Sequence, residues 1–323
     1  MSFKLLIFPP QNWGISANES AWPDLLKQAV PGIEVRYANS LGDALDMIDN
    51  VDAAYGDIVP KLFERAHHLK WIACPQAGPP SGYYHPALVR SDVIVTNTRQ
   101  IYNDHASAQI MSYVLAFARG LHFYMPRQRR RAWRGRYQTI HLPESTAIIV
   151  GVGGIGAETA RLCSEFGMTV VAVDPRVEHP PRGVAELHGP EAIGGVLHRG
   201  DFVIVTVPET PDTLGMFDSK MISLMKNSAI FINIGRGTTT VLADLVKALQ
   251  AGELGGAALD TYDPEPLPPD HALWELPNVI ITPHVAGRGP YLQERRTELF
   301  IDNCIRFNEG RPLRNVADKR QWF

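Results

Sequence analysis

Cysteine is scarce in this chain, and its few copies follow no pattern. Cys74, Cys163 and Cys304 are odd in number and widely spaced. Disulfide frameworks and zinc sites need closely spaced cysteines, so the sequence predicts neither a disulfide scaffold nor a metal site. So few thiols suit a reducing compartment, which makes the cytoplasm the expected location.

A long apolar run and a strong net charge are also missing. The apolar run near the N-terminus ends at Pro9 and Pro10, which is too short for the core of a signal peptide, and no later stretch is long enough to span a bilayer. The formal net charge of −3 gives the chain as a whole no electrostatic attraction to nucleic acid or to an anionic membrane. Neither is therefore expected as a partner.

The chain does have the length and composition of a globular protein. Its 323 residues, 45% hydrophobic and 20% charged, are enough for two domains with cores of their own. Short apolar runs alternate with helical patterns, which is typical of βαβ units with parallel strands. The sequence therefore predicts an α/β fold with two doubly wound parallel sheets. Strands are expected at 5–8, 34–37, 53–55, 71–73 and 93–95, and in a second series at 146–150, 170–173, 202–207, 229–234, 257–259 and 279–281.

Helices are expected between these strands. The longest has apolar residues at helical spacing from Ile110 to Ala118; Asn103 or Asp104 can cap its start, and Gly120 is a natural stop. The last helix, at about 291–307, follows the final strand and is a candidate to return to the first domain. The others are expected at 24–30, 61–66, 155–166, 220–225 and 242–251.

A glycine-rich loop joins the first strand of the second series to its helix. It reads Gly151-Val152-Gly153-Gly154-Ile155-Gly156. This spacing, after an apolar strand and before an amphipathic helix, predicts a dinucleotide-binding loop. The first glycine allows the tight turn, the second lets the backbone approach a pyrophosphate, and the third packs helix on strand. The helix N-terminus then offers its amide groups to the phosphates.

Asp174, at the end of the next strand, bears on the choice of cofactor. An acidic residue there binds the ribose hydroxyls of NAD and repels the extra phosphate of NADP. NAD is therefore the expected cofactor. Arg176, two residues on, could tolerate a phosphate, so NADP stays possible. The alternative interpretation, a mere tight turn with a polar strand end, is disfavoured by the strand-loop-helix context.

Arg236, Glu265 and His284 stand in three separate loops downstream of the glycine loop. A guanidinium can hold a carboxylate through two parallel hydrogen bonds. An imidazole can pass a proton near neutral pH, and a neighbouring carboxylate can orient it and keep it protonated. Each residue alone is more often a surface arginine, a solvated glutamate or a core histidine. Together they predict hydride transfer to or from a small 2-oxo or 2-hydroxy acid.

These motifs resemble the D-isomer-specific 2-hydroxyacid dehydrogenase family, and its glyoxylate/hydroxypyruvate reductases in particular. The resemblance is specific from about 146 to 287 and looser over the rest of the chain. It implies a flavodoxin-like substrate domain at 1–101, to which 291–323 returns. A Rossmann NAD domain at 102–290 is inserted into it, and the expected protein is a homodimer.

The resemblance also implies roles for individual residues. Arg236, Glu265 and His284 are the expected catalytic residues, with Arg236 and His284 also touching the substrate. The backbone amides of Ala77 and Gly78 are expected to bind its carboxylate. Cofactor contacts are expected from the glycine loop and Asp174, and from Val207, Thr213, Ile234 and Asp260, with Asp260 on the nicotinamide side.

Two segments depart from the family pattern. The substrate loop has Gln76 and Pro80 where the family usually has glycine and aspartate, and Thr240-Val241 replaces a usual valine-aspartate pair. These changes bear on the identity of the substrate more than on the reaction.

The segment 127–136 holds six arginines and Trp133. It suggests either a nucleic-acid patch or a solvated arm that contacts a second subunit, and the second interpretation is favoured because nothing else in the chain points to nucleic acid. In relatives this region lies in an arm that packs on the partner subunit, where Trp133 could reach the neighbour's substrate pocket.

Three functions remain open at this point. The leading one is an NAD-dependent reductase of glyoxylate, hydroxypyruvate or a D-lactate-like substrate. A formate dehydrogenase of the same superfamily would pair its histidine with glutamine, so Glu265 argues against it. A non-catalytic NADH-sensing scaffold, as in corepressor relatives, is the alternative from a different class, because a fold does not by itself confer function.

Overall fold

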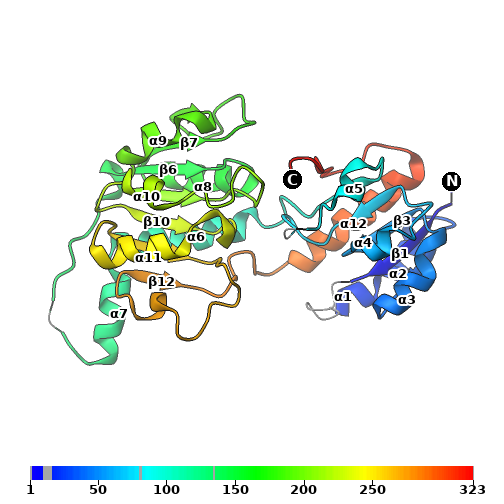
Figure 1. Ribbon diagram of the computed structural model, residues 1–323, viewed down its shortest axis with the longest axis horizontal. Helices are drawn as coiled ribbons and strands as arrows, with labels where there is room; N and C mark the ends of the chain where they lie inside the picture. The colour runs from blue at the N-terminus through cyan, green and yellow to red at the C-terminus, as the bar shows by residue number, and fades with distance from the viewer. Residues whose placement is uncertain (1, 10–16, 80–81, 134, 323) are drawn as a thin grey trace. The chain divides into compact units, whose positions relative to one another are not determined.

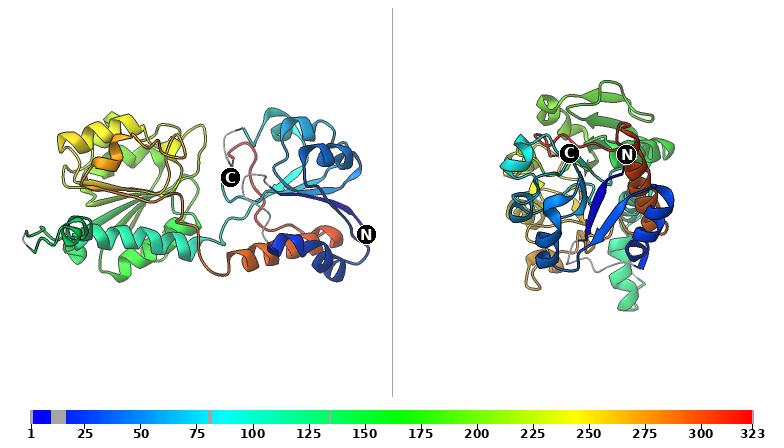
Figure 2. Two further views of the ribbon diagram at one scale, coloured as in Figure 1. Left: turned by 90° about the horizontal axis from the view of Figure 1, so that it is seen from below. Right: turned by 90° about the vertical axis from the view of Figure 1, so that its right-hand side faces the viewer.

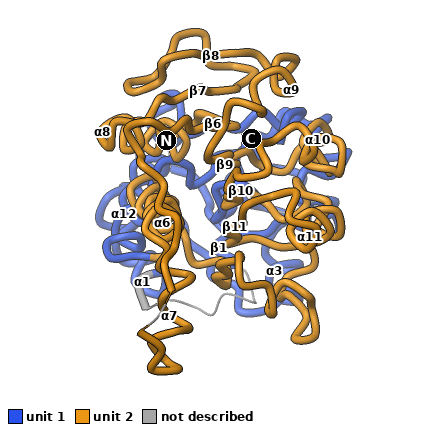
Figure 3. The backbone as a smooth tube through the Cα atoms, turned by 90° about the vertical axis from the view of Figure 1, so that its left-hand side faces the viewer, with its two compact units in different colours: residues 1–101, 289–323 blue, residues 102–288 orange. Residues whose placement is uncertain are grey.

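The computed structural model describes residues 2–9, 17–79, 82–133 and 135–322. The chain divides into two compact units (Figure 3): unit 1 is Met1–Ile101 with Gly289–Phe323, and unit 2 is Tyr102–Arg288. The returning segment expected at 291–323 lies within unit 1, and the expected Rossmann domain covers unit 2.

Unit 1 is built on a five-stranded sheet in the order β2-β1-β3-β4-β5. Every neighbouring pair is parallel, and this order is that of flavodoxin-like folds. The first expected fold is therefore confirmed. The strands are β1 (Lys4–Phe8), β2 (Glu34–Tyr37), β3 (Ala53–Gly56), β4 (Trp71–Ala73) and β5 (Ile94–Thr96).

Helices cover both faces of this sheet. One face packs against α2 and α12, where Trp22 donates a hydrogen bond to the hydroxyl of Thr297 (2.9 Å) and Phe300 lies in the same core cluster. The other face packs against residues of α3, α4 and α5. The last helix of the chain is thus part of the first unit. The helices are α1 (Ala17–Ser20), α2 (Trp22–Ala29), α3 (Leu41–Met47), α4 (Pro60–Phe63), α5 (Pro86–Arg90) and α12 (Leu292–Glu309), with a 3₁₀ turn η1 (Ile48–Asn50).

Unit 2 is built on a seven-stranded sheet in the order β12-β11-β10-β9-β6-β7-β8. All of its pairs are parallel, and the order, counted from β6, is that of the Rossmann fold extended by one strand. The second expected fold is confirmed too. The strands are β6 (Thr146–Val150), β7 (Thr169–Val173), β8 (Glu186–His188), β9 (Phe202–Val205), β10 (Ile230–Asn233), β11 (Gly256–Leu259) and β12 (Val279–Ile281).

The helices of unit 2 lie in two layers (Figures 1 and 2). Residues of α6 and α8 form a core with one face of the sheet, and residues of α10 and α11 form a core with the other. Both faces are therefore buried, as near-continuous apolar strands require. The helices are α6 (Asn103–Ala118), α7 (Leu121–Arg129), α8 (Gly154–Glu165), α9 (Ile193–Val196), α10 (Ser219–Ser223) and α11 (Leu242–Ala251). The 3₁₀ turns are η2 (Leu142–Glu144), η3 (Pro190–Ala192), η4 (Leu197–Arg199), η5 (Gly237–Thr239) and η6 (Ala272–Glu275).

The start of α6 differs from the expectation. Neither Asn103 nor Asp104 is the N-cap; both lie inside the helix, and the N-cap is Tyr102, whose side chain makes no capping hydrogen bond. The backbone of Tyr102 is already helical (φ −107°, ψ −4°), so the chain enters the helix one residue earlier than a polar cap would allow. The predicted stop is confirmed, since Gly120 separates α6 from α7.

The cysteines are all unpaired and buried. Burial raises the pKa of the Cys74 and Cys163 thiols to about 12. A buried, protonated thiol is a poor nucleophile and a poor metal ligand, so these side chains serve packing.

The N-terminus of α11 lacks a capping side chain. Val241 is its N-cap, with extended backbone (φ −73°, ψ 94°), a 37% exposed side chain and no cap hydrogen bond. The valine that replaces the family's usual aspartate at this position therefore leaves the start of the helix without a side-chain cap.

We expect Val241→Asp to raise the free energy of unfolding by about 1 kcal/mol, because the carboxylate can accept a hydrogen bond from an amide of the first turn. Chemical denaturation measures this; Val241→Asn, a neutral cap, should give a similar gain, and no gain from either would contradict it.

Candidate active site

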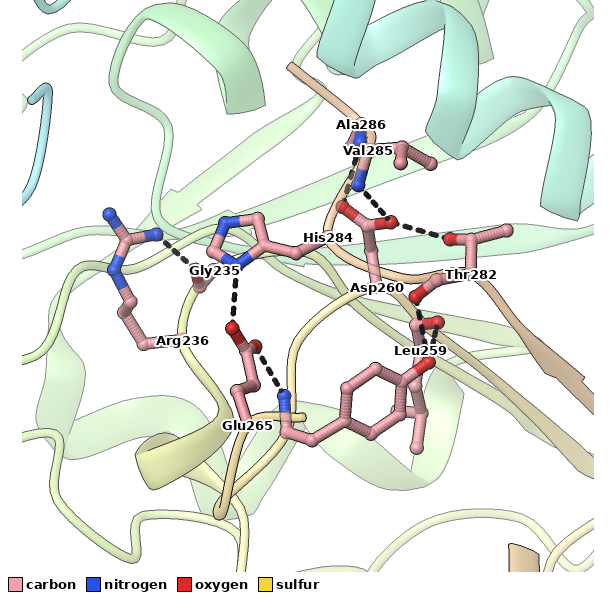
Figure 4. A network of polar contacts seen from close by, with 10 residues as sticks. Gly235, Arg236, Leu259, Asp260, Glu265, Thr282, His284, Val285 and Ala286 are labelled. Carbon is pink, nitrogen blue, oxygen red and sulfur yellow. Dashed lines mark hydrogen bonds and ion pairs between the residues drawn. The ribbon is translucent and has the colours of Figure 1, made fainter. Parts of the chain in front are cut away.

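The expected acid/base pair is in direct contact. Nδ1 of His284 lies 2.8 Å from Oε2 of Glu265, and the other oxygen of Glu265 accepts a hydrogen bond from the amide of Tyr262 (2.8 Å). The strands that precede these loops, β11 and β12, are neighbours in the sheet, so their carboxyl ends meet at one edge. Figure 4 shows both side chains there, with Arg236 beside them. The His284 side chain is 49% exposed and that of Glu265 34%, which leaves the pair accessible to a ligand.

The backbone of His284 has an unusual conformation. Its φ is +51°, in the left-handed region that residues with a side chain rarely adopt. Asp260 holds the loop in this shape: its carboxylate accepts hydrogen bonds from the amides of Val285 (2.9 Å) and Ala286 (2.8 Å) and from the Thr282 hydroxyl. Asp260 is only 1% exposed. Positive φ at a non-glycine residue persists where the surroundings enforce it, as these bonds do.

Arg236 stands on a tightly held turn after β10. Its carbonyl accepts hydrogen bonds from Asn233 (3.2 Å) and from the Thr239 hydroxyl (2.7 Å), and its own Nη1 donates to the carbonyl of Gly235 (2.6 Å). A Cβ at Gly237 would lie 2.0 Å from the carbonyl group of Tyr262, so this turn packs directly on the loop that carries Glu265. The arginine is thereby fixed next to the acid/base pair.

Charge interactions link the three side chains. Burial raises the pKa of Glu265, but hydrogen bonds from His284 and the Tyr262 amide, with the charges of His284 and Arg236, outweigh it and hold this pKa below its usual value. Burial lowers the pKa of Arg236, and the carboxylates of Glu265 and Glu209 oppose that shift. Glu265 is therefore a carboxylate and Arg236 a cation at neutral pH.

The glycine loop has the shape that a dinucleotide needs. Gly151 has φ +90°, and a Cβ there would lie 2.9 Å from the Val207 side chain. A Cβ at Gly156 would lie 1.9 Å from the carbonyl oxygen of Gly151, so helix and strand approach as closely as the third glycine allows. Gly153 faces open space, and α8 begins directly after it without a side-chain cap. Room and free amides are thus available for a pyrophosphate.

Asp174 is bonded to this loop. One carboxylate oxygen accepts from the amide of Val152 (2.9 Å), and the other accepts from the amides of Arg176 (2.9 Å) and Val177 (3.2 Å). The side chain is therefore a brace for the glycine loop as well as a candidate ribose ligand. No local sequence pattern indicates this bracing role.

The other expected ligand-binding residues are placed as follows. Val207 and Ile234 follow β9 and β10 and are both buried. The Thr213 hydroxyl donates to the carbonyl of Pro208 (2.7 Å) and accepts from the amide of Thr210 (2.8 Å), which closes its own loop. Ala77 and Gly78 belong to unit 1, where Asn97 donates to the carbonyl of Ala77 (3.1 Å). Pro80, which departs from the family pattern in the same loop, lies outside the described residues.

The arginine-rich segment begins in the last turn of α7, a helix without buried residues, and continues beyond it. The guanidinium of Arg127 stacks over the ring of Phe123, 3.3 Å from its centroid, and Trp133 is fully exposed. Met125 and Leu121 are about half exposed, at 55% and 49%. The surface of this arm is thus apolar as well as basic. Arg134 lies outside the described residues.

Sequence reasoning missed four residues of the site. Tyr262, Thr282 and Thr238 hold the loops, and Glu209 contributes a buried carboxylate next to Arg236. Only Glu209 had a signal: a charged residue directly after an apolar strand, between two prolines of one short loop. Among the described residues, no group of three or more His, Cys, Asp or Glu could hold a metal ion, and no helix is long and apolar enough to cross a membrane.

Comparisons with known proteins agree with this geometry. The family described as "D-isomer specific 2-hydroxyacid dehydrogenase, NAD binding domain" matches residues 111–286. A glyoxylate reductase of Pyrococcus furiosus is 30% identical over 288 residues, which are 85% of this chain and 84% of that protein. A D-isomer specific 2-hydroxyacid dehydrogenase of Xanthobacter autotrophicus, solved with NADPH and MES, has a TM-score of 0.84 at 28% identity and covers both chains fully. An NADPH-dependent glyoxylate/hydroxypyruvate reductase of Sinorhizobium meliloti, solved with NADP and sulfate, has a TM-score of 0.82 at 28% identity, covering 99% of this chain and all of that one.

Proposed function

Because this chain belongs to the D-isomer specific 2-hydroxyacid dehydrogenase family and carries its NAD-binding domain, we propose that it reduces a small 2-oxo acid to the 2-hydroxy acid with NADH. The observation that carries the proposal is the 2.8 Å contact of His284 with Glu265, beside Arg236. All three side chains stand at the carboxyl ends of neighbouring strands in the unit that holds the glycine loop. Ligands bind at this edge in doubly wound sheets.

Each residue has a defined part in this proposal. Arg236 holds the substrate carboxylate with two charge-assisted hydrogen bonds. The bound dinucleotide supplies the hydride to the substrate's C2. His284 gives its proton to the carbonyl oxygen as that oxygen gains negative charge, and it takes the proton back in oxidation. Glu265 keeps the imidazole oriented, and Asp260 holds the loop that carries His284.

The substrate class follows from the relatives and from the binding groups. Relatives of this chain are named glyoxylate reductase and glyoxylate/hydroxypyruvate reductase. A single arginine for one carboxylate suits a short 2-oxo acid such as glyoxylate, hydroxypyruvate or pyruvate.

Turnover tests this proposal. Wild-type protein is mixed with glyoxylate, hydroxypyruvate and pyruvate in turn, with NADH and with NADPH, and the loss of reduced-cofactor absorbance is followed. Reduction of at least one of them is expected. NADH binding without turnover of any 2-oxo acid would contradict the proposed enzyme function and favour the alternative, a non-catalytic NADH-sensing protein.

Cofactor preference gives a second test. We expect NADH to be preferred, because Asp174 repels the NADP phosphate and bonds the ribose hydroxyls. Asp174→Asn removes the charge and keeps one acceptor oxygen, which can still serve the amide of Val152. It should therefore narrow the preference for NADH by roughly tenfold, the value of one hydrogen bond to a charged group. Asp174→Ala should also narrow the preference for NADH. It should weaken the binding of both cofactors, because the hydrogen bond from the amide of Val152 is lost. Equal or better efficiency of the wild type with NADPH would contradict this and implicate Arg176.

A cytoplasmic homodimer is part of the same proposal. The exposed apolar residues of the arm, Leu121, Met125 and Trp133, support a second copy of the chain as the partner. In such a dimer Trp133 can contribute to the neighbour's substrate pocket. Light scattering at micromolar concentration tests the assembly, and a monomer would remove this part of the proposal. Three unpaired, buried cysteines suit a reducing compartment.

A further inference from the structure

Glu209 is a buried carboxylate that the proposed reaction does not use. It follows β9, whose neighbour in the sheet, β10, precedes Arg236, so the two loops meet at one edge. Its side chain is almost enclosed, with 9% of the residue exposed. A carboxylate in such a position loses water and needs compensating contacts, so its presence calls for a physical account.

The two oxygens of Glu209 differ. Oε2 accepts a hydrogen bond from the hydroxyl of Thr238 (2.8 Å), two residues beyond Arg236. Oε1 is buried and accepts no hydrogen bond within the described part of the chain. One hydroxyl is a weak compensation for a buried negative charge. The remaining compensation is electrostatic, and it comes from Arg236, whose cation Glu209 and Glu265 both stabilise.

The carboxyl ends of these neighbouring strands carry three carboxylates, Glu209, Asp260 and Glu265, besides the Arg236 cation. A substrate with one carboxylate brings one further negative charge to this set. A substrate with two anionic groups adds two, and Coulomb repulsion from Glu209 grows in proportion to the charge brought in.

We propose that Glu209 determines specificity by restricting the Arg236 site to 2-oxo acids with a single negative charge. This inference rests on the proposed function, because it takes Arg236 as the carboxylate-binding residue. The substrate class it names is the monoanionic 2-oxo acids, as against 2-oxo dicarboxylates and phosphorylated 2-oxo acids.

Glu209→Gln isolates the charge. The amide oxygen of glutamine can still accept from Thr238, so the loop contact stays while the negative charge is removed. Oxamate and oxalate are matched probes, since they have nearly the same size and carry one and two negative charges. Their affinities for NADH-loaded wild-type and variant protein are measured by calorimetry.

The expected changes follow from electrostatics. Removing one nearby negative charge should raise the affinity for oxamate by roughly threefold and the affinity for oxalate by roughly tenfold, because the change in binding free energy scales with the charge of the probe. Asp212→Asn, which removes an exposed charge from the same loop, should change neither. Thr238→Val, which removes the hydrogen bond and keeps the charge, should leave the ratio of the two affinities as in wild type. Thermal unfolding of each variant checks that it is folded.

Three outcomes would overturn the inference. Equal changes for oxamate and oxalate in Glu209→Gln would show that the charge does not discriminate. Weaker binding of both would make Glu209 a positioning residue for the Arg236 turn. If the wild type does not bind oxamate, the assignment of Arg236 as a carboxylate-binding residue is wrong. Normal oxamate binding without turnover of any 2-oxo acid would instead sink the proposed function alone.

Discussion

Replacing His284 by alanine is expected to lower the rate of 2-oxo acid reduction by about 10²–10⁴-fold, because a positioned acid contributes that much to proton transfer. The loss should occur in both directions and at every pH, since in the proposed reaction the same imidazole donates the proton in reduction and accepts it in oxidation. NADH affinity should change little. His198→Ala, at an exposed position on η4, is the matched control and should keep full activity.

Glu265→Gln should shift the pH dependence of the same reaction. The pKa of Glu265 is held below its usual value, so its carboxylate is charged throughout the neutral range and favours the protonated imidazole at 2.8 Å. Glutamine keeps the shape and removes that charge. The pH at which reduction falls on the alkaline side should therefore move lower, and reduction should weaken at neutral pH. Oxidation should suffer less there, because its base is more often neutral.

Rates measured against pH in both directions, for the wild type and the two variants, decide this prediction. A reduction profile that keeps its alkaline limb in Glu265→Gln would mean that the carboxylate does not tune the acid. An active His284→Ala variant would remove the histidine from the mechanism.

The second large effect is expected at Arg236. Arg236→Lys keeps the positive charge but loses the two parallel donors that match a carboxylate. Each hydrogen bond to a charged group contributes on the order of 1.5–3 kcal/mol, so kcat/KM should fall by roughly tenfold to a hundredfold. The cofactor loop is a separate element, and the KM for NADH should stay nearly unchanged. Initial rates over a range of both substrates separate the two effects.

Arg199→Lys provides the matched control. Arg199 donates two hydrogen bonds to Glu186 of β8. β8 is the outermost strand on the side of the seven-stranded sheet opposite to β12. The same substitution there should leave kcat/KM unaffected. If Arg236→Lys has normal turnover, or fails mainly in binding NADH, its assignment to the substrate carboxylate is wrong.

The sequence predicted the fold because the strands are strongly apolar. β1, β6 and β9 are nearly fully buried runs, and such runs between helical patterns specify parallel sheets. β8 was missed because Glu186 and His188 are half-buried polar residues at the sheet edge, where no apolar run forms. The polar cap expected for α6 was wrong because Tyr102 continues the helical backbone, which depends on packing rather than on side-chain type.

The site was predictable in its charged side chains and not in their supports. Arg236, Glu265 and His284 follow three adjacent strands, so their meeting at one edge follows from topology. The brace from Asp174 to Val152 and the bond from Thr238 to Glu209 join loops that are far apart in sequence. No local pattern encodes such bonds, because they depend on the three-dimensional course of both loops.

The left-handed backbone of His284 has a consequence for how this chain can change under selection. Such a conformation costs a residue with a side chain about 1 kcal/mol or more, and glycine or asparagine would adopt it more readily. Stability and turnover therefore have opposite requirements at position 284, because the substitutions that relax the backbone also remove the imidazole. Histidine can be retained there only while selection for activity outweighs selection for a more stable fold.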